Sequence, residues 1–206
     1  MQVDDAGHRR LLSARAACER LRAVGLSRRH AQRVLDSGLA GPPTRLPSAT
    51  LFDAARVEHL LTWPTLEEAA IDTACPWGLF VGRRPPDRPL TSHGQWDRAR
   101  VEWDMPAITG AWIRICVDRH GFFPFVQTVG GFVALGADIV DVRVVAHGDG
   151  GLQQRERRLL LREPGAWFDA LQQRRLVTGA GPPYLIRGWH PTAGGGPGWG
   201  VGHCSP

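Results

Sequence analysis

The apolar positions of residues 13–38 recur every three or four residues, which is the spacing of one face of an α-helix. Ser13 and Ser27 each stand before such a run, and a serine hydroxyl caps the free backbone N–H groups at a helix N-terminus. Gly25 and Gly38 stand where the two runs stop. The pattern predicts two short amphipathic helices joined by a tight turn, the second over residues 28–37.

A short hairpin is predicted after the second helix. The breaker Gly41-Pro42-Pro43 is followed by two brief extended segments, residues 44–46 and 50–52, on either side of the turn Pro47-Ser48-Ala49. Asp53 then stands where a carboxylate can cap a helix over residues 54–61. Residues 13–61 therefore read as two helices, a hairpin and a third helix.

This order resembles the winged helix-turn-helix domain of the MerR and excisionase class. The resemblance covers residues 9–63 and departs from the MerR regulators in two ways. Pro64 and Pro76 leave only a short helix, over residues 66–73, where MerR regulators have a long coiled coil, and the hairpin turn is less basic. The matching motifs are Leu11-Leu12-Ser13, Gly25-Leu26-Ser27-Arg28-Arg29, Ser37-Gly38-Leu39 and Thr50-Leu51-Phe52-Asp53, followed by Val57 and Leu60.

The resemblance implies binding to double-stranded DNA. By similarity, the second helix enters the major groove and the hairpin forms a wing, whose Arg45 approaches a phosphate or the adjacent minor groove. Forked arginine and amide side chains at helical spacing suit the base edges of that groove. The expected DNA-binding residues are Ser27, Arg28, Arg29, His30, Gln32, Arg33, Thr44 and Arg45.

Sequence patterns typical of β-strands dominate the second half of the chain. Residues 111–117, 122–129, 132–135 and 139–146 read as strands, and residues 152–162 as a further strand or, from their spacing, a helix. A helix is expected from Pro164 to about residue 174, then an edge strand over residues 182–186. The predicted fold class is α+β, with a mainly antiparallel sheet in the second domain.

The expected organisation has four parts. Residues 1–75 form the DNA-binding domain, and residues 76–109 form loops and a linker with a short helix at 96–103. Residues 110–190 form the α+β domain, and residues 191–206 form a disordered, glycine-rich tail.

The composition and charge of the chain exclude several classes of catalytic and phosphate-binding site. All 25 basic residues of the 206 are arginine, which we attribute to genomic base composition, and neither Lys nor Asn occurs. The usual P-loop, Schiff-base and papain-like sites therefore cannot be built. Residues 1–64 contain 10 arginines and 6 acidic residues, and residues 151–206 contain 7 and 3, so both ends of the chain are basic. Residues 65–150, with 8 arginines and 11 acidic residues, are acidic. Basic ends suit a nucleic-acid partner.

No other site stands out. The four cysteines, Cys18, Cys75, Cys116 and Cys204, lack paired spacing and read as reduced thiols, with Cys116 filling space in a strand. Polar residues that suggest acid–base chemistry lie beside turns, and the glycines of residues 130–136 do not form a phosphate-binding loop. The sequence therefore predicts no enzyme, cofactor or metal. The acid–base candidates were Asp118, His120 and Asp149.

The resulting hypothesis is a cytoplasmic, sequence-specific DNA-binding protein without a signal peptide or membrane segment. We expect a transcriptional regulator or an excisionase-like recombination accessory factor. Its C-terminal domain would form a homodimer or bind a small-molecule or protein effector. The alternative is a protein–protein adaptor that uses the winged helix as a docking module.

Overall fold

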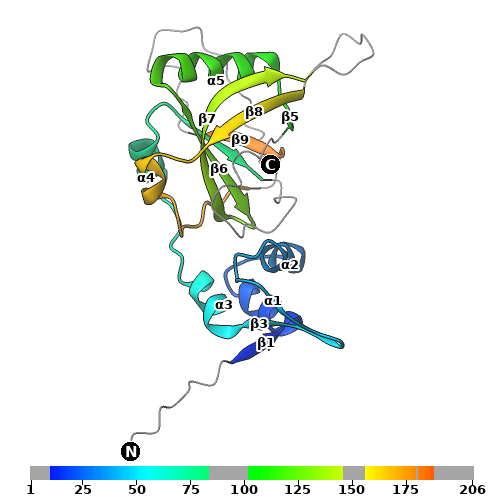
Figure 1. Cartoon of the computed structure of the whole chain (residues 1–206). Coiled ribbons are helices and arrows are strands. Elements are labelled where there is room, and N and C mark those ends of the chain that lie inside the picture. The colour runs from blue at the N-terminus through cyan, green and yellow to red at the C-terminus, as the bar shows by residue number, and fades with distance from the viewer. Residues whose placement is uncertain (1–9, 84–101, 146–155, 180, 188–206) are drawn as a thin grey trace, which may run out of the picture.

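The computed structural model describes residues 10–83, 102–145, 156–179 and 181–187. Its first part, the N-terminal unit, packs three helices against a small antiparallel sheet of order β1-β3-β2 (Figure 1). The three predicted helices and the hairpin are confirmed, and the opening Leu-Leu-Ser motif adds an edge strand. The elements are β1 (Leu11–Ser13), α1 (Ala14–Arg22), α2 (Arg28–Asp36), β2 (Thr44–Leu46), β3 (Ala49–Asp53) and α3 (Ala54–Leu61).

Short-range hydrogen bonds explain why these elements form. The Ser13 hydroxyl accepts a hydrogen bond from Ala16 N at 3.2 Å, and the Asp53 carboxylate accepts one from Ala55 N at 2.9 Å. Each satisfies a helix N–H group that has no partner within its helix. Gly25 has a φ of +83°, which lets the chain turn sharply between α1 and α2.

The second part, the sheet unit, is a mixed six-stranded sheet that curves like half a barrel (Figure 1). Its order is β5-β8-β7-β6-β4-β9, and among the described strands only β4 and β6 pair in parallel. Together with the first part, this confirms the α+β class. The strands are β4 (Leu79–Gly82), β5 (Glu102–Asp104), β6 (Phe123–Val129), β7 (Phe132–Val144), β8 (Glu156–Arg162) and β9 (Tyr184–Arg187).

Helices cover both faces of this sheet. On one face, α5 (Ala107–His120) buries Ile113 and Cys116 against an aromatic core. On the other face lie α4 (Glu68–Ala74) and the 3₁₀ turn η1 (Ala166–Ala170). The burial of apolar side chains on both faces explains why β6 is entirely buried.

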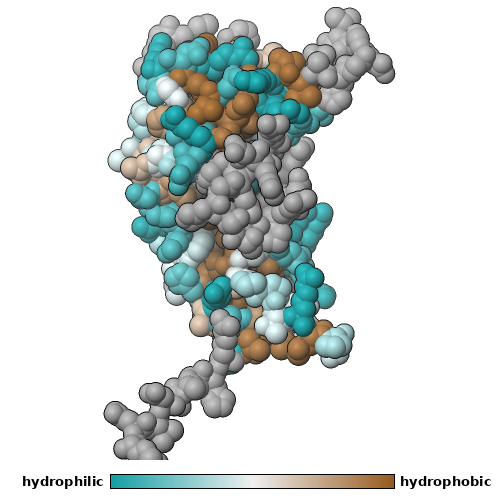
Figure 2. Space-filling view, viewed as in Figure 1, coloured by the Kyte–Doolittle hydropathy of each residue, from teal (hydrophilic) through white to brown (hydrophobic). Residues whose placement is uncertain are grey.

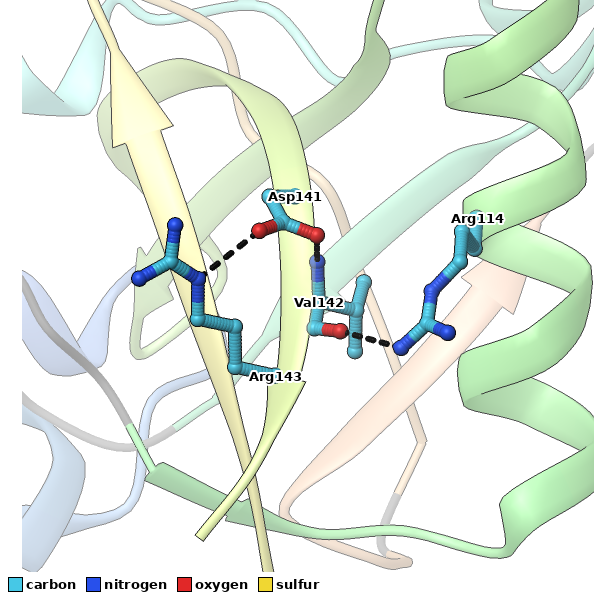
Figure 3. Close-up of polar contacts among 4 residues, drawn as sticks. All are labelled: Arg114, Asp141, Val142 and Arg143. Atoms are coloured by element: carbon cyan, nitrogen blue, oxygen red, sulfur yellow. Dashed lines mark hydrogen bonds and ion pairs between the residues drawn. The ribbon is translucent and has the colours of Figure 1, made fainter.

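Polar contacts fix α5 to the sheet (Figure 3). The Arg114 guanidinium of α5 donates to the carbonyl oxygen of Val142 at 2.6 Å, next to a bulge in β7. The Asp141 carboxylate accepts from Val142 N and from Arg143 Nε, both at 2.8 Å. The Arg143 hydrogen bond holds the pKa of Asp141 below its usual value, so this carboxylate stays charged. The position of α5 is thereby fixed on the strand that it covers.

The second half corrects several sequence predictions. Residues 111–117 are not a strand but the middle of α5, and Cys116 lies on this helix. Its apolar residues lie on both helix faces, so their spacing resembles that of a strand. Residues 164–174 form only the short turn η1, and Gln173 with a φ of +54° prevents a continuous helix.

Other elements lie where loops or breaks were expected. Strands β4 and β5 and the start of α5 fall within residues 76–109, for which the sequence predicts loops and a linker. Residues 102 and 103 are extended, and the rest of the short helix expected at 96–103 lies outside the described residues. The two strands predicted over 132–146 form one continuous strand, β7. The strands predicted over 122–129 and 182–186 are confirmed as β6 and the edge strand β9. Of residues 152–162, for which a strand or a helix is expected, residues 156–162 form the strand β8, and residues 152–155 lie outside the described residues.

The turn between β6 and β7 joins the two units. Val129 and Phe132, on either side of this turn, belong to the buried core of the N-terminal unit. The Phe132 ring meets Trp63 edge to face, with 5.7 Å between ring centroids. A Cβ atom on Gly130 would lie 2.9 Å from Cγ2 of Val34 in α2. The two units therefore share one core at this point.

Arg175 closes the same junction. Its backbone N donates to Pro64 O at 2.9 Å, and its carbonyl accepts from Leu66 N at 2.8 Å. Its guanidinium donates to Val24 O at 2.8 Å and lies over the Phe132 ring, 5.3 Å from the centroid. One residue thus binds the connecting segment, the turn between α1 and α2, and the β6–β7 hairpin.

We expect Gly130→Ala to destabilise the protein more than Gly121→Ala. Both glycines have positive φ, +59° and +83°, so both substitutions carry similar backbone strain. Only at Gly130 would the added methyl group press on buried Val34, whereas nothing lies within 4 Å at Gly121. Chemical denaturation should show a difference in unfolding free energy of about 1 to 3 kcal/mol. Equal losses would mean that the turn does not pack against α2.

We also expect Arg175→Ala to lower the free energy of unfolding by about 2 kcal/mol, because it leaves the Val24 carbonyl without its partner and removes the cation from Phe132. The matched control is Arg174→Ala, since Arg174 is exposed and its backbone contact survives the substitution. This control should change stability by less than about 0.5 kcal/mol. Equal losses in urea titrations of the two variants would contradict the role given to Arg175.

Candidate nucleic-acid interface

Helix α2 presents a polar face on the outside of the N-terminal unit. Its buried residues, Ala31, Val34 and Leu35, hold it against α1 and the core. Arg28, Arg29, His30 and Gln32 are exposed, and Arg33 is half-buried. Five of the predicted site residues therefore lie on one short helix.

The first turn of α2 is held in place by its cap. The Ser27 hydroxyl accepts a hydrogen bond from His30 N at 3.2 Å, as the sequence predicts for a capping serine. Ser27 is exposed, but this bond gives its oxygen a structural role. It fixes the direction in which Arg28 and Arg29 leave the helix.

The amide of Gln32 already has partners within the protein. Its nitrogen donates to the Asp36 carboxylate at 2.8 Å, and its oxygen accepts from the Cys18 thiol at 3.5 Å. Burial raises the pKa of the Cys18 thiol, which therefore stays protonated and keeps its role as donor. Gln32 would have to leave these partners to contact a base, so the arginines are better placed to do so.

The β2–β3 hairpin extends away from the three helices (Figure 1). Thr44 pairs with Leu51 and Arg45 with Thr50, and both residues of β2 are exposed. Leu46, at the end of β2, is also exposed. The predicted hairpin residues therefore lie on a free arm, separate from α2 in sequence.

Charge on the N-terminal unit is unbalanced. Residues 10–61 contain nine arginines and four carboxylates. Glu58 pairs with Arg20 at 2.6 Å, Glu19 lies 3.9 Å from Arg22, Asp36 accepts from Gln32 and Asp53 caps α3. Within the described chain, no ion pair involves the four arginines of α2 and β2, namely Arg28, Arg29, Arg33 and Arg45.

Among the described residues, the sheet unit reaches α2 at the β6–β7 turn. The β6–β7 turn lies against Val34 and the backbone of His30. At 3.6 residues per turn, Arg29 and Arg33 lie roughly 140° and 100° around the helix from Val34. In the described part of the chain, the β6–β7 turn therefore does not cover this arginine-bearing side of α2, on which Arg29 is exposed and Arg33 is half-buried.

The chemical alternatives lack a clustered site in the described residues. Cys75 and Cys116 are buried, and burial raises the pKa of Cys75 to about 12 and that of Cys116 to about 11. His120 stacks on Trp77 with 4.5 Å between ring centroids, while Asp118 is exposed. Asp149, Cys204 and residues 191–206 lie outside the described residues. In the parts of the chain that are described, no three metal-ligating side chains come together.

Sequence reasoning missed the residues that set the position of α2. Gly130 contacts Val34, 96 residues away, and Arg175 contacts Val24, 151 residues away, so local spacing carries no signal of either contact. No known protein family, curated protein or solved structure matches the chain. Across the described ranges, no helix is long and apolar enough to cross a membrane.

Proposed function

We propose that the protein binds double-stranded DNA through a winged helix-turn-helix domain, with α2 in the major groove and the β2–β3 hairpin as the wing. The observation that carries this proposal is a set of four arginines on α2 and β2 that form no ion pair with any of the described residues. Of the four carboxylates in residues 10–61, Glu19, Glu58 and Asp53 have partners outside α2 and β2, and Asp36 of α2 accepts a hydrogen bond from Gln32. A surface with this excess of unpaired arginine attracts the phosphate backbone.

The size and chemistry of α2 support this placement. An α-helix with its side chains is about 10 to 12 Å wide, close to the width of the major groove. Arg29 and Arg33 are one helical turn apart on the open side of α2. Each guanidinium can donate two hydrogen bonds to one guanine edge, which makes these residues our candidates for sequence reading.

The hairpin supplies the second contact. Arg45 and Thr44 are exposed on an arm that extends beyond the helices, where a charge and a hydroxyl can meet phosphate oxygens. Arg28, at the start of α2, suits a phosphate at the groove edge. We assign sequence preference to α2. The phosphate contacts of Arg28, Thr44 and Arg45 would set the position of the protein along the duplex.

The proposed role is that of a transcriptional regulator or an excisionase-like accessory factor, acting without catalysis. The sheet unit would then serve in self-association or in effector binding. Because it shares a core with the N-terminal unit, a change in the β6–β7 turn would act directly on α2. The alternative is an adaptor that docks a protein on the same surface, and the salt dependence of binding separates the two.

We expect Arg29→Ala and Arg33→Ala each to weaken binding to the selected duplex and to flatten sequence preference. A bidentate base contact contributes about 1 to 3 kcal/mol, so affinity should fall roughly 5- to 150-fold. The duplex would first be selected from a random pool and then titrated by fluorescence anisotropy. Arg143→Ala removes the same charge from the sheet unit and should bind like the parent protein.

Two outcomes would contradict this proposal. One is the absence of duplex binding by the folded parent protein at low salt, which would favour the adaptor. The other is an equal loss of affinity in Arg29→Ala, Arg33→Ala and Arg143→Ala, because this would indicate attraction by net charge without a specific contact. Circular dichroism would verify that each variant is folded.

Arg45→Ala should behave differently from the α2 variants. A lost phosphate contact weakens binding to all sequences alike and lowers the slope of log affinity against log salt by about 1. The measurement is anisotropy titration at four salt concentrations with the selected duplex and a scrambled one. An unchanged slope together with lost sequence preference would instead show that the wing reads bases.

A further inference from the structure

Helix α5 is apolar on its outer side as well as its inner side. Ile113 and Cys116 face the sheet, yet Ile108 is 68% exposed and Ile115 is 56% exposed. Ala111, also exposed, lies between these isoleucines. The three residues follow the spacing i, i+3, i+7 and so form one stripe along the helix. We call them the outer stripe.

The outer stripe lies on a well-fixed helix. Arg114 donates to Val142 O (Figure 3). The Trp112 ring packs edge to face on Phe123, with 5.1 Å between ring centroids. α5 therefore cannot rotate to bury Ile108 and Ile115 without breaking contacts with β6 and β7. Figure 2 shows hydrophobic residues exposed among hydrophilic ones in the part of the surface where α5 lies.

We propose that the outer stripe is a self-association surface, on which α5 of a second copy of this chain packs in antiparallel orientation. A two-fold axis near Ala111 sets Ile108 of each copy opposite Ile115 of the other. The small side chain at the centre permits a close approach, near the lower end of the usual 8 to 10 Å between packed helices. A surface that is complementary to itself under this rotation is what a two-fold dimer requires.

Charges at the two ends of α5 match this arrangement. The same axis brings the end of α5 that carries Arg119 towards the start of the partner's α5. Asp104, the last residue of β5, precedes that helix by three residues, and both Arg119 and Asp104 are exposed. The axis also brings Asp118 to the partner's helix N-terminus, where no side chain caps the free N–H groups. Negative charge is favourable at that end of a helix. In a parallel pair, by contrast, like ends and like charges would meet.

The position of the outer stripe leaves the proposed DNA-binding surface free. Trp112 of α5 contacts Phe123 at the start of β6, whereas Val129 at the end of β6 packs into the N-terminal unit. The two surfaces thus lie beyond opposite ends of one strand (Figure 1). Self-association through α5 does not depend on DNA binding, so the two proposals can fail separately.

The test is the mass of the full chain in solution, without DNA. Light scattering after size exclusion and sedimentation velocity, from about 1 to 100 µM, should give a dimer of twice 22.6 kDa. Ile108→Arg combined with Ile115→Arg should raise the dissociation constant at least about tenfold. Val177→Arg places the same charge at another exposed apolar residue, 58% exposed and outside α5, and should remain dimeric.

Charge reversal tests the antiparallel orientation. Arg119→Asp should weaken the dimer, and adding Asp104→Arg in the same chain should restore it, because the pair is then reversed in both copies. A parent protein that stays monomeric throughout the concentration range would overturn the proposal, whatever else covers the stripe. So would a dimer that survives the double isoleucine substitution, or a failure of the second charge change to rescue the first.

Discussion

The junction between the two units depends on Arg175. Its backbone amide and carbonyl bond the segment that connects α3 to α4, and its guanidinium bonds the carbonyl that follows α1. The same guanidinium covers the Phe132 ring, which fills the core of the N-terminal unit. A cation at this position also faces the negative end of the α1 dipole. A single side chain therefore combines packing, hydrogen bonding and charge at the site where the two units meet.

This junction determines how the polar face of α2 can be used. A DNA-binding helix on a flexible linker could approach a duplex in many orientations, whereas α2 is held on one side by Gly130 and on another by α1. In the proposed complex, this fixed position would reduce the conformational entropy lost on DNA binding. It also means that anything that moves the β6–β7 turn would move α2. The sheet unit is thus in direct contact with the N-terminal unit at this turn.

The N-terminal unit was predictable because its signals are local. Ser13, Ser27 and Asp53 each cap the helix that follows directly, and Gly25 turns the chain within four residues. The site residues on α2 and β2 could be assigned to exposed faces for the same reason. What spacing could not show is that the Gln32 amide is taken up by Asp36 and Cys18, since the second contact joins two helices. Tertiary contacts decide which of the polar residues on a predicted face are free.

The sheet unit was harder to predict because of burial on both sides. β6 is buried along its whole length, so it shows no alternation of apolar and polar residues. α5 was predicted as a strand for a related reason, as Ile108 and Ile115 are apolar on the side that faces away from the sheet. In a helix with one buried face, such positions are polar, and the helical period is then visible in the sequence. The apolar residues of the outer stripe are thus the reason why the helical period of α5 is not visible in the sequence. In the proposed dimer, a second helix packed on this stripe would bury both faces of α5.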